Sequence, residues 1–197
     1  SGKNSGHWKR NLIRFEGEVE FNNVKSEKGL CMMNDAVLNN IEINVADENY
    51  ALWITAQGQT VNVDGLKVTA TNSGRGIKIA DEDYENSAEK IVLEVKNATF
   101  VTAEKAAVLV TSTAGAEITW GEGNNINGVA ADPVNAVWVD EDRSDYYDKV
   151  VVTGATKILE GAAEISVIST AEQFREALKT ASDGDFIVLA DGTYEGL

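Results

Sequence analysis

The stretch Val19-Glu20-Phe21-Asn22-Asn23-Val24 decides the fold, because its pattern returns along most of the chain. The pattern reads apolar, any residue, apolar, any residue, Asn or Gly, apolar. Clear copies occur at residues 36–41, 61–66, 93–98 and 150–155, and a looser copy occurs at 118–123. Alternating apolar residues turn one face of a strand toward a core. Asn or Gly suits a corner in left-handed backbone conformation, which Gly adopts without steric cost and Asn with little.

Short apolar strands precede most of these copies and complete a repeating unit. They occur at residues 12–15, 30–33, 51–54, 76–79, 107–110 and 136–139, and their starts are 18, 21, 25, 31 and 29 residues apart. Repeated strand–corner–strand units stack so that each coil buries its apolar edge on its neighbours. We therefore expect an all-β fold, a right-handed parallel β-helix over residues 1–163. Stacked Asn side chains at the corners are expected to be buried and hydrogen-bonded to one another.

An antiparallel sandwich or barrel is the alternative fold. Such a fold is expected to show Asn-Gly or Asp-Gly hairpin turns at intervals of roughly 8–12 residues. Asp64-Gly65 and Asn127-Gly128 are present, but the corner residues return in one fixed slot of the pattern. That constancy favours the β-helix.

Composition narrows the range of partners. The 197 residues include 32 Asp and Glu against 17 Lys and Arg, a net charge of −15. Such a surface repels phosphate backbones, so we expect no nucleic-acid partner. No apolar stretch reaches the roughly 20 residues of a membrane-spanning helix, so we expect no membrane insertion.

The single cysteine, Cys31, lies in an apolar run and is expected to be a small buried side chain. The single histidine, His7, lies in a Gly- and Lys-rich start and forms no metal-binding or catalytic constellation with other residues.

The last segment, residues 164–197, changes from a strand pattern to a helix pattern. Ser169 and Glu172 have the spacing of a capping box, and Phe174, Ala177 and Leu178 follow at helical spacing. We therefore expect a short α-helix near residues 170–182. An apolar strand at 186–189 and the sequence Asp-Gly-Thr-Tyr at 191–194 come next.

This segment resembles the amino-terminal cap of the pectate-lyase-like β-helix superfamily, especially the chondroitinase B-like lyases and related bacterial surface proteins. There a phrase like Ser-Thr-x-x-Gln-Phe, a short helix, Gly-Asp-x-Ile-x-Leu and Asp-Gly-Thr-Tyr opens the solenoid. The match is confined to residues 164–197, and the other coils resemble the superfamily only in their repeat pattern. In the family the helix closes the open end of the core.

Here the opening cap lies at the end of the sequence, which leaves four explanations. The chain is a circularly permuted domain, its sequence is given out of its natural frame, it continues into a next module, or its last segment caps the next copy. In the last case copies join head to tail by strand addition. The residues expected to form this contact are Phe186, Val188, Leu189 and Tyr194.

The resemblance implies a polysaccharide lyase, in which a Lys or Arg base abstracts a proton while calcium or a basic residue neutralises a uronic-acid carboxylate. The cations of the repeat strands are spread over separate coils: Arg14, Lys67, Lys78 and Lys96. The net charge would also repel a polyanionic substrate. We therefore expect a non-catalytic, extracellular or cell-surface module, structural or adhesin-like, whose partners are further copies or a surface glycan. A polysaccharide lyase or a carbohydrate-binding relative acting on uronic-acid-containing glycans is the alternative.

Two acidic insertions directly follow short strands, at residues 81–85 and 140–148. The second holds Asp140, Asp142, Asp145 and Asp148 within nine residues. Calcium binds closely spaced carboxylates and carbonyls, although neither insertion has the spacing of an EF-hand loop. We expect no required cofactor, and we predict that calcium, if any ion is bound, binds at 140–148. A solvated acidic loop is the alternative.

Two tryptophans occupy the same slot of equivalent short strands. Trp53 and Trp138 are each flanked by residues expected to point inward, so we expect both indoles to face outward on one side. Exposed aromatic patches mark binding surfaces, and this pair is the candidate platform for a carbohydrate or a protein. Packing beneath a loop is the alternative.

Overall fold

The computed structural model describes residues 12–46, 50–71, 75–81, 89–102, 106–127, 129–130, 136–160, 168, 170–181, 187, 189 and 193–195. At residues 75, 129–130 and 141–144 it describes the backbone and not the side chains.

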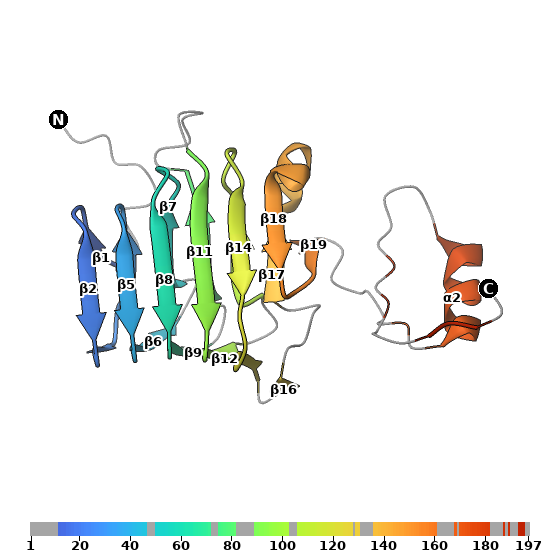
Figure 1. The fold of residues 1–197 in the computed structure, drawn as a ribbon, viewed down its shortest axis with the longest axis horizontal. Helices are drawn as coiled ribbons and strands as arrows, with labels where there is room; N and C mark the ends of the chain where they lie inside the picture. The colour runs from blue at the N-terminus through green and yellow to red at the C-terminus, as the bar shows by residue number, and fades with distance from the viewer. Residues whose placement is uncertain are drawn as a thin grey trace.

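Strands that lie far apart in the sequence stack side by side into three sheets along one axis (Figure 1). The A sheet contains, in spatial order, β1 (Leu12–Phe15), β4 (Gly29–Met32), β7 (Tyr50–Thr55), β10 (Arg75–Ala80), β13 (Val108–Val110), β17 (Val137–Val139) and β19 (Lys157–Leu159). The B sheet contains β2 (Val19–Asn22), β5 (Ala36–Asn39), β8 (Thr60–Asp64), β11 (Ile91–Lys96), β14 (Ala116–Trp120) and β18 (Val150–Thr153). The C sheet contains β3 (Lys25–Ser26), β6 (Glu42–Ala46), β9 (Lys67–Thr71), β12 (Thr99–Thr102), β15 (Asn125–Ile126) and β16 (Val129–Ala130).

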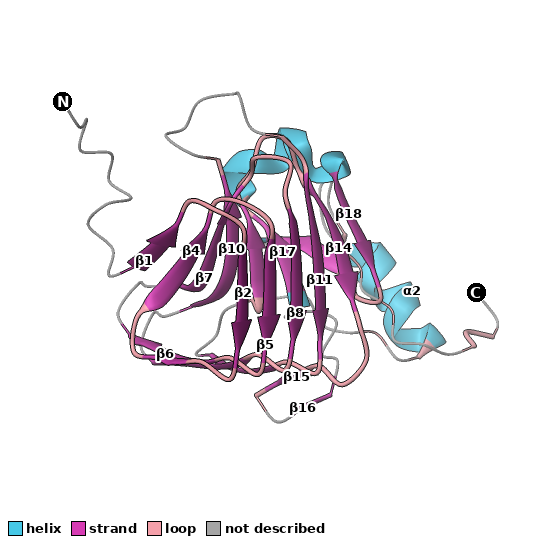
Figure 2. Ribbon diagram, turned by 60° about the vertical axis from the view of Figure 1, so that its left-hand side comes forward, coloured by secondary structure: helices cyan, strands magenta, loops and turns pink. Residues whose placement is uncertain are grey.

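The order of the strands along the chain makes the fold a parallel β-helix. Each full coil contributes one strand to the A, B and C sheets in turn, and every pairing between described strands is parallel except that of β15 with β16. Figure 2 shows the C sheet lying across the ends of the A-sheet and B-sheet strands. The predicted β-helix is therefore confirmed, and the antiparallel sandwich is excluded by the direction of pairing.

The predicted corner slot adopts the left-handed backbone conformation in all five clear copies of the pattern. The φ angles are 58° at Asn23, 54° at Asn40, 79° at Gly65, 52° at Asn97 and 85° at Gly154. Because residues other than Gly and Asn rarely adopt this conformation, the residue type at the slot fixes where the chain leaves the B sheet.

The looser copy of the pattern has one additional residue at its corner. Val95 pairs with Trp120 and Thr99 pairs with Asn125. Thr99 is four positions after Val95, whereas Asn125 is five positions after Trp120. The left-handed position falls on Gly123, with φ 75°. The insertion explains why the sequence of this coil matches the pattern imperfectly.

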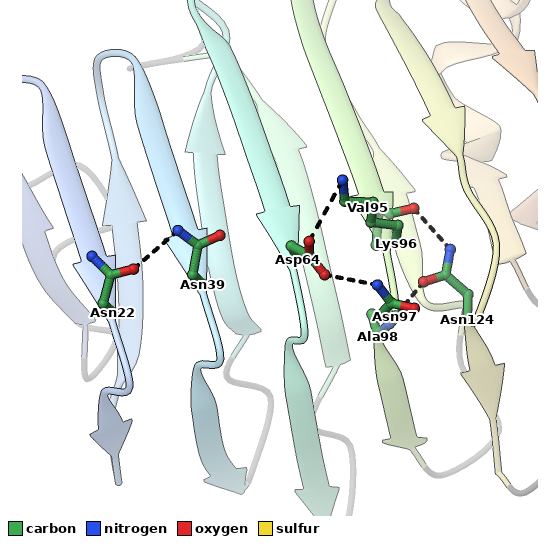
Figure 3. A network of polar contacts seen from close by, with 8 residues as sticks. All are labelled: Asn22, Asn39, Asp64, Val95, Lys96, Asn97, Ala98 and Asn124. Carbon is green, nitrogen blue, oxygen red and sulfur yellow. Dashed lines mark hydrogen bonds and ion pairs between the residues drawn. The ribbon is translucent and has the colours of Figure 1, made fainter.

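The side-chain amides form a ladder, but the prediction that this ladder is buried at the corners is wrong. Asn39 Nδ2 donates to Asn22 Oδ1 at 3.0 Å, and Asn97 Nδ2 donates to Asp64 Oδ1 at 2.8 Å, and both bonds are exposed (Figure 3). Asn22, Asn39 and Asp64 lie in one outward row of the B sheet. The inward rows take the apolar residues of the pattern, which leaves these amides on the outer surface. Asn124 differs: it is 5% exposed, and its side chain donates to the Val95 oxygen and accepts from the Ala98 N–H of the neighbouring coil.

One continuous apolar core fills the interior of the coils. A typical inward row runs through Leu38, Val63, Val95 and Trp120, each at most 4% exposed. Burying a side chain of this kind stabilises the fold by about 1.5–3 kcal/mol. Phe100 of the C sheet stacks on the Trp120 ring, with centroids 5.8 Å apart, so the rows of different sheets meet at the centre.

The predicted short helix is present as α2 (Ala171–Thr180), but its capping box is shifted by one residue from the prediction. Thr170, and not Ser169, is the N-cap: its side chain accepts from the Gln173 backbone N–H, and the Gln173 side chain accepts from the Thr170 N–H. Both registers satisfy the sequence rule. The extended backbone of Thr170, with φ −131° and ψ 153°, excludes it from the first helical turn. The division at residue 163 stays a prediction, because residues 161–167 lie outside the described ranges.

Candidate functional site

The first coil leaves part of the apolar core exposed. Ile13 and Phe15 of β1 lie in the inward rows of the A sheet, where they pair with Leu30 and Met32 of β4. Leu30 is 2% exposed and Met32 0%, whereas Ile13 is 42% exposed and Phe15 is only partly buried. The inward row therefore changes from covered to exposed within one coil.

Two phenylalanines pack against each other in the first coil. Phe15 of β1 and Phe21 of β2 meet edge to face, with ring centroids 4.9 Å apart. Val19 and Val24 pack beside them, and all four are partly buried against the core. Because β1, β2 and β3 are the last described strands of their sheets at this end, they present an edge to which a further strand could be added.

The last coil ends differently, with a lysine in the inward row. Lys157 of β19 pairs with Val137 of β17, which is fully buried in the core. Lys157 Nζ donates to the backbone oxygens of Tyr147 and Val150, at 2.7 Å each, and lies 4.0 Å from the centre of the Tyr147 ring. The Tyr147 hydroxyl donates back to the Lys157 backbone oxygen at 2.8 Å. The side chain of each residue thus donates a hydrogen bond to the backbone oxygen of the other.

Burial shifts the titration of both partners. Withdrawal from water lowers the pKa of the Lys157 ammonium below its ordinary value of 10.5, although the nearby Asp148 carboxylate opposes this shift. The same withdrawal raises the pKa of the Tyr147 hydroxyl above 10.0, and Asp148 adds to that rise. Both shifts indicate that the pair is partly enclosed rather than freely solvated.

The 3-10 helix η2 (Glu141–Lys149) supplies Tyr147 and covers this end of the core. It contacts β17, β18 and β19, and Figure 1 shows it beside β18. Lys149 Nζ donates to the Thr113 backbone oxygen at 3.2 Å and lies 4.5 Å from the centre of the Tyr146 ring. A nine-residue segment of the chain therefore packs against the last coil.

The terminal segment contains a small pairing of its own. Ile168 forms an isolated parallel bridge with Leu189, and the Tyr194 hydroxyl donates to the Ile168 backbone oxygen at 2.6 Å. Ile168 is 5% exposed, whereas no residue of α2 is buried and Leu178 is 54% exposed. The described part of this segment therefore has one buried side chain, Ile168, and the apolar side chains of α2 are partly or largely exposed to solvent.

The predicted assembly residues divide into two groups. Leu189, which is 41% exposed, and Tyr194 meet at Ile168, while Phe186 and Val188 lie outside the described residues. The sequence interpretation did not select Ile168, because a single isoleucine ahead of a helix carries no periodic signal.

The prediction that Trp53 and Trp138 form an exposed platform is wrong. They do occupy one outward row of the A sheet, but they are only 3% and 5% exposed. Both belong to a second apolar cluster outside the coil interior, with Cys31, Leu109 and Ile158 among its members. Alternation along a strand predicts which face a residue occupies, but not which distant segment covers that face. Cys31, 8% exposed, is the small buried side chain that the sequence predicts.

The acidic insertions have other roles in the described structure. Asp140, Asp145 and Asp148 form no metal-binding group, since the described residues contain no cluster of three His, Cys, Asp or Glu suited to a metal ion. The Asp142 side chain lies outside the described part, so the calcium prediction stays untested as a set of four. Asp81 is 5% exposed and accepts from the Thr113 backbone N–H at 3.0 Å and from its hydroxyl at 2.7 Å. Asp81 therefore links neighbouring coils, and residues 82–88 lie outside the described ranges.

The class of protein defined by these observations is a parallel β-helix whose two ends differ. Comparison with protein-family models, with curated proteins and with solved structures finds no match to this chain. None of the described helices is long and apolar enough to cross a membrane.

Proposed function

We propose that this chain is a non-catalytic structural or adhesin-like module of the extracellular space or cell surface, and that its copies join end to end. The observation that carries the proposal is the exposed inward row of the first coil, where Ile13 is 42% exposed beside the partly buried Phe15 and Phe21. Open apolar side chains on the edge strands β1 and β2 form a surface suited to a further coil.

The proposed occupant of this surface is the terminal segment of the next copy. Its exposed apolar residues include Leu178 of α2 and Leu189. A pair of strands joined by one bridge is not stable by itself in water, so this segment gains by packing on a larger sheet. The contact joins two different surfaces, and repetition of such a contact produces an open chain of subunits rather than a closed dimer.

The resemblance of residues 164–197 to the opening cap of pectate-lyase-like proteins supports the same arrangement and the extracellular setting. In that superfamily a segment of this kind lies on the first coil. In this chain the first coil and the terminal segment stand at opposite ends of the β-helix sequence. If the terminal segment of one copy packs on the first coil of another copy, the two parts become neighbours without any permutation of the chain. Membership of the superfamily is part of the proposal, as is a surface glycan as a second partner. We propose no required cofactor, and calcium at residues 140–148 stays a prediction.

The arrangement of the cations supports the absence of catalysis. Arg14 Nε lies 3.3 Å from Glu16, Lys96 Nζ lies 3.5 Å from Asp64, and Lys78 Nζ lies 4.7 Å from the centre of the Trp53 ring. Each cation interacts with a nearby side chain on its own part of the surface, whereas a lyase site needs its base and its charge-neutralising group to converge on one sugar.

The test of assembly is the mass of the full chain in solution, measured by light scattering over a concentration series. Self-association that grows with concentration is expected, and Leu178→Lys is expected to abolish it. Val151→Lys is the matched control, because Val151 is 49% exposed on the outer face of the B sheet. A chain that is monomeric at every concentration would contradict the proposal.

The lyase alternative has its own assay. The protein is incubated with polygalacturonate, alginate and glycosaminoglycans, and the absorbance of the new double bond is followed. We expect no increase. A steady increase proportional to protein concentration would replace the structural proposal with the enzymatic one.

A further inference from the structure

The last coil carries a feature that the proposed assembly does not use. Six strands of the A sheet contribute apolar residues to one inward row, in the order Ile13, Leu30, Leu52, Ile77, Val108 and Val137. The seventh strand places Lys157 in the same row. Lysine thus replaces the apolar residue in β19, the last described strand of the A sheet.

We propose that Lys157 is an end-stop, which prevents the last coil from accepting a coil or strand of a second copy. This inference goes beyond the proposed function, because it holds whether or not copies join through the terminal segment. The blocked partner is another copy of this chain, whose first coil presents the complementary apolar row that begins with Ile13.

The contacts of Lys157 hold the charge in the place where another coil would stack. An ammonium has three protons to donate, and two of them bind the backbone oxygens of Tyr147 and Val150. A stacked coil would remove water from the third proton and enclose the charge in apolar surroundings, which is unfavourable without a paired anion. Charged residues that point inward on an edge strand are one way in which proteins avoid edge-to-edge association.

Tyr147 makes this charge difficult to move aside. Its ring lies against the ammonium at 4.0 Å, and its hydroxyl holds the backbone of β19 through the Lys157 oxygen. Tyr147 itself packs against the apolar core. The lysine side chain is therefore fixed at both its base and its tip, unlike a surface lysine that can turn into solvent.

The test uses the full chain in the Leu178→Lys background, which removes the proposed route of assembly. Adding Lys157→Met replaces the ammonium with an apolar side chain of similar length. The association constant is expected to rise about tenfold or more, as when a charge no longer has to be buried. Lys67→Met in the same background is the matched control, because it removes the same charge from an exposed position of β9, away from the last coil, and is expected to change nothing. Unchanged association of a folded Lys157→Met variant would overturn the inference.

A second measurement needs no variant and tests the fixed position of the amine. The unmodified chain is treated briefly with acetic anhydride, and the acetylation of each lysine is read by peptide mass mapping. The reaction is run at a pH above the ordinary lysine pKa, where the amines are neutral and the rates report access alone. Lys157, held by two carbonyls, is expected to react several-fold more slowly than the exposed Lys67. Equal rates would show that the ammonium is not held and would contradict the end-stop. Because the first test is made with the terminal contact already removed and the second does not depend on association, a failure of the end-stop is distinguishable from a failure of the proposed assembly.

Discussion

The first and last coils of this β-helix are built from the same sheets, yet they end the core in opposite ways. At the first coil the inward row of the A sheet ends in Ile13, which is 42% exposed. At the last coil the same row ends in Lys157, which is tied to Tyr147 and covered in part by η2. At this one register position the first coil thus presents an exposed isoleucine, and the last coil a lysine that is bonded to its own coil.

The comparison teaches that a solenoid needs separate solutions for its interior and its ends. Interior coils have neighbours on both sides, so any apolar residue of suitable size satisfies the row. An end coil has one neighbour, and its inward residues must be covered, made polar or matched to a partner. Here one inward position of the last coil is polar, and we propose that the first coil is matched to a partner.

The largest expected difference in stability is between a substitution in the middle of the stack and one in the first coil. Leu52→Ala empties a fully buried position in the inward row and is expected to lower the free energy of unfolding by about 2–5 kcal/mol. Ile13→Ala removes side-chain atoms from the same row at a position that is 42% exposed, and the loss is expected to be about 1 kcal/mol or less. Urea unfolding of both variants, at concentrations below assembly, measures the difference. Equal losses would show that the first coil is as well covered as the middle.

A smaller effect sharpens the description of the closed end. Tyr147→Phe removes the hydrogen bond to the Lys157 backbone oxygen and is expected to cost about 0.5–1.5 kcal/mol. Tyr146→Phe on the same helix is the control, and a change of a few tenths of a kcal/mol is expected there. If the two variants unfold at the same urea concentration, the tyrosine hydroxyl does not fasten β19.

The smallest effect concerns the exposed ladder on the outer face of the B sheet. The Asn97 side chain donates to Asp64 and, with Lys96, keeps the pKa of the Asp64 carboxyl below 3.8. A carboxyl whose pKa is lower in the folded state contributes stability that is present above its unfolded pKa and is lost as the pH falls through the folded value. NMR titration of Asp64 is expected to show this low pKa, and Asn97→Ala is expected to raise it. An unchanged Asp64 titration would mean that the amide does not hold the carboxylate in solution.

The interior of the fold could be predicted from the sequence because it repeats. Asn23, Asn40 and Gly65 have the left-handed backbone that the corner pattern requires, and the apolar alternation predicts the inward rows. Each of these signals is local and occurs several times, so a single irregular coil does not hide it.

The ends could not be predicted in the same way. Lys157 interrupts the apolar alternation at an inward position. For that reason the sequence pattern did not predict the seventh strand of the A sheet, β19. Tyr147 lies ten residues from Lys157 in a segment that reads as a solvated acidic loop. Trp53 and Trp138 are buried in a cluster with residues of other coils, among them Cys31 and Leu109. Features that occur once and join distant residues leave no periodic signal.

The most direct measurement of the central claim is a disulfide formed between two copies. Full chains carrying Cys31→Ala receive either Ile13→Cys or Leu189→Cys, and equal amounts of the two are mixed under mild oxidation. The account predicts a disulfide-linked heterodimer that forms much faster than either homodimer, because the terminal segment of one copy lies on the first coil of the other. A Val151→Cys chain, mixed in place of the Ile13→Cys chain, is expected to form little heterodimer. Cross-linking of Leu189→Cys to Ile13→Cys no faster than to Val151→Cys would contradict end-to-end assembly.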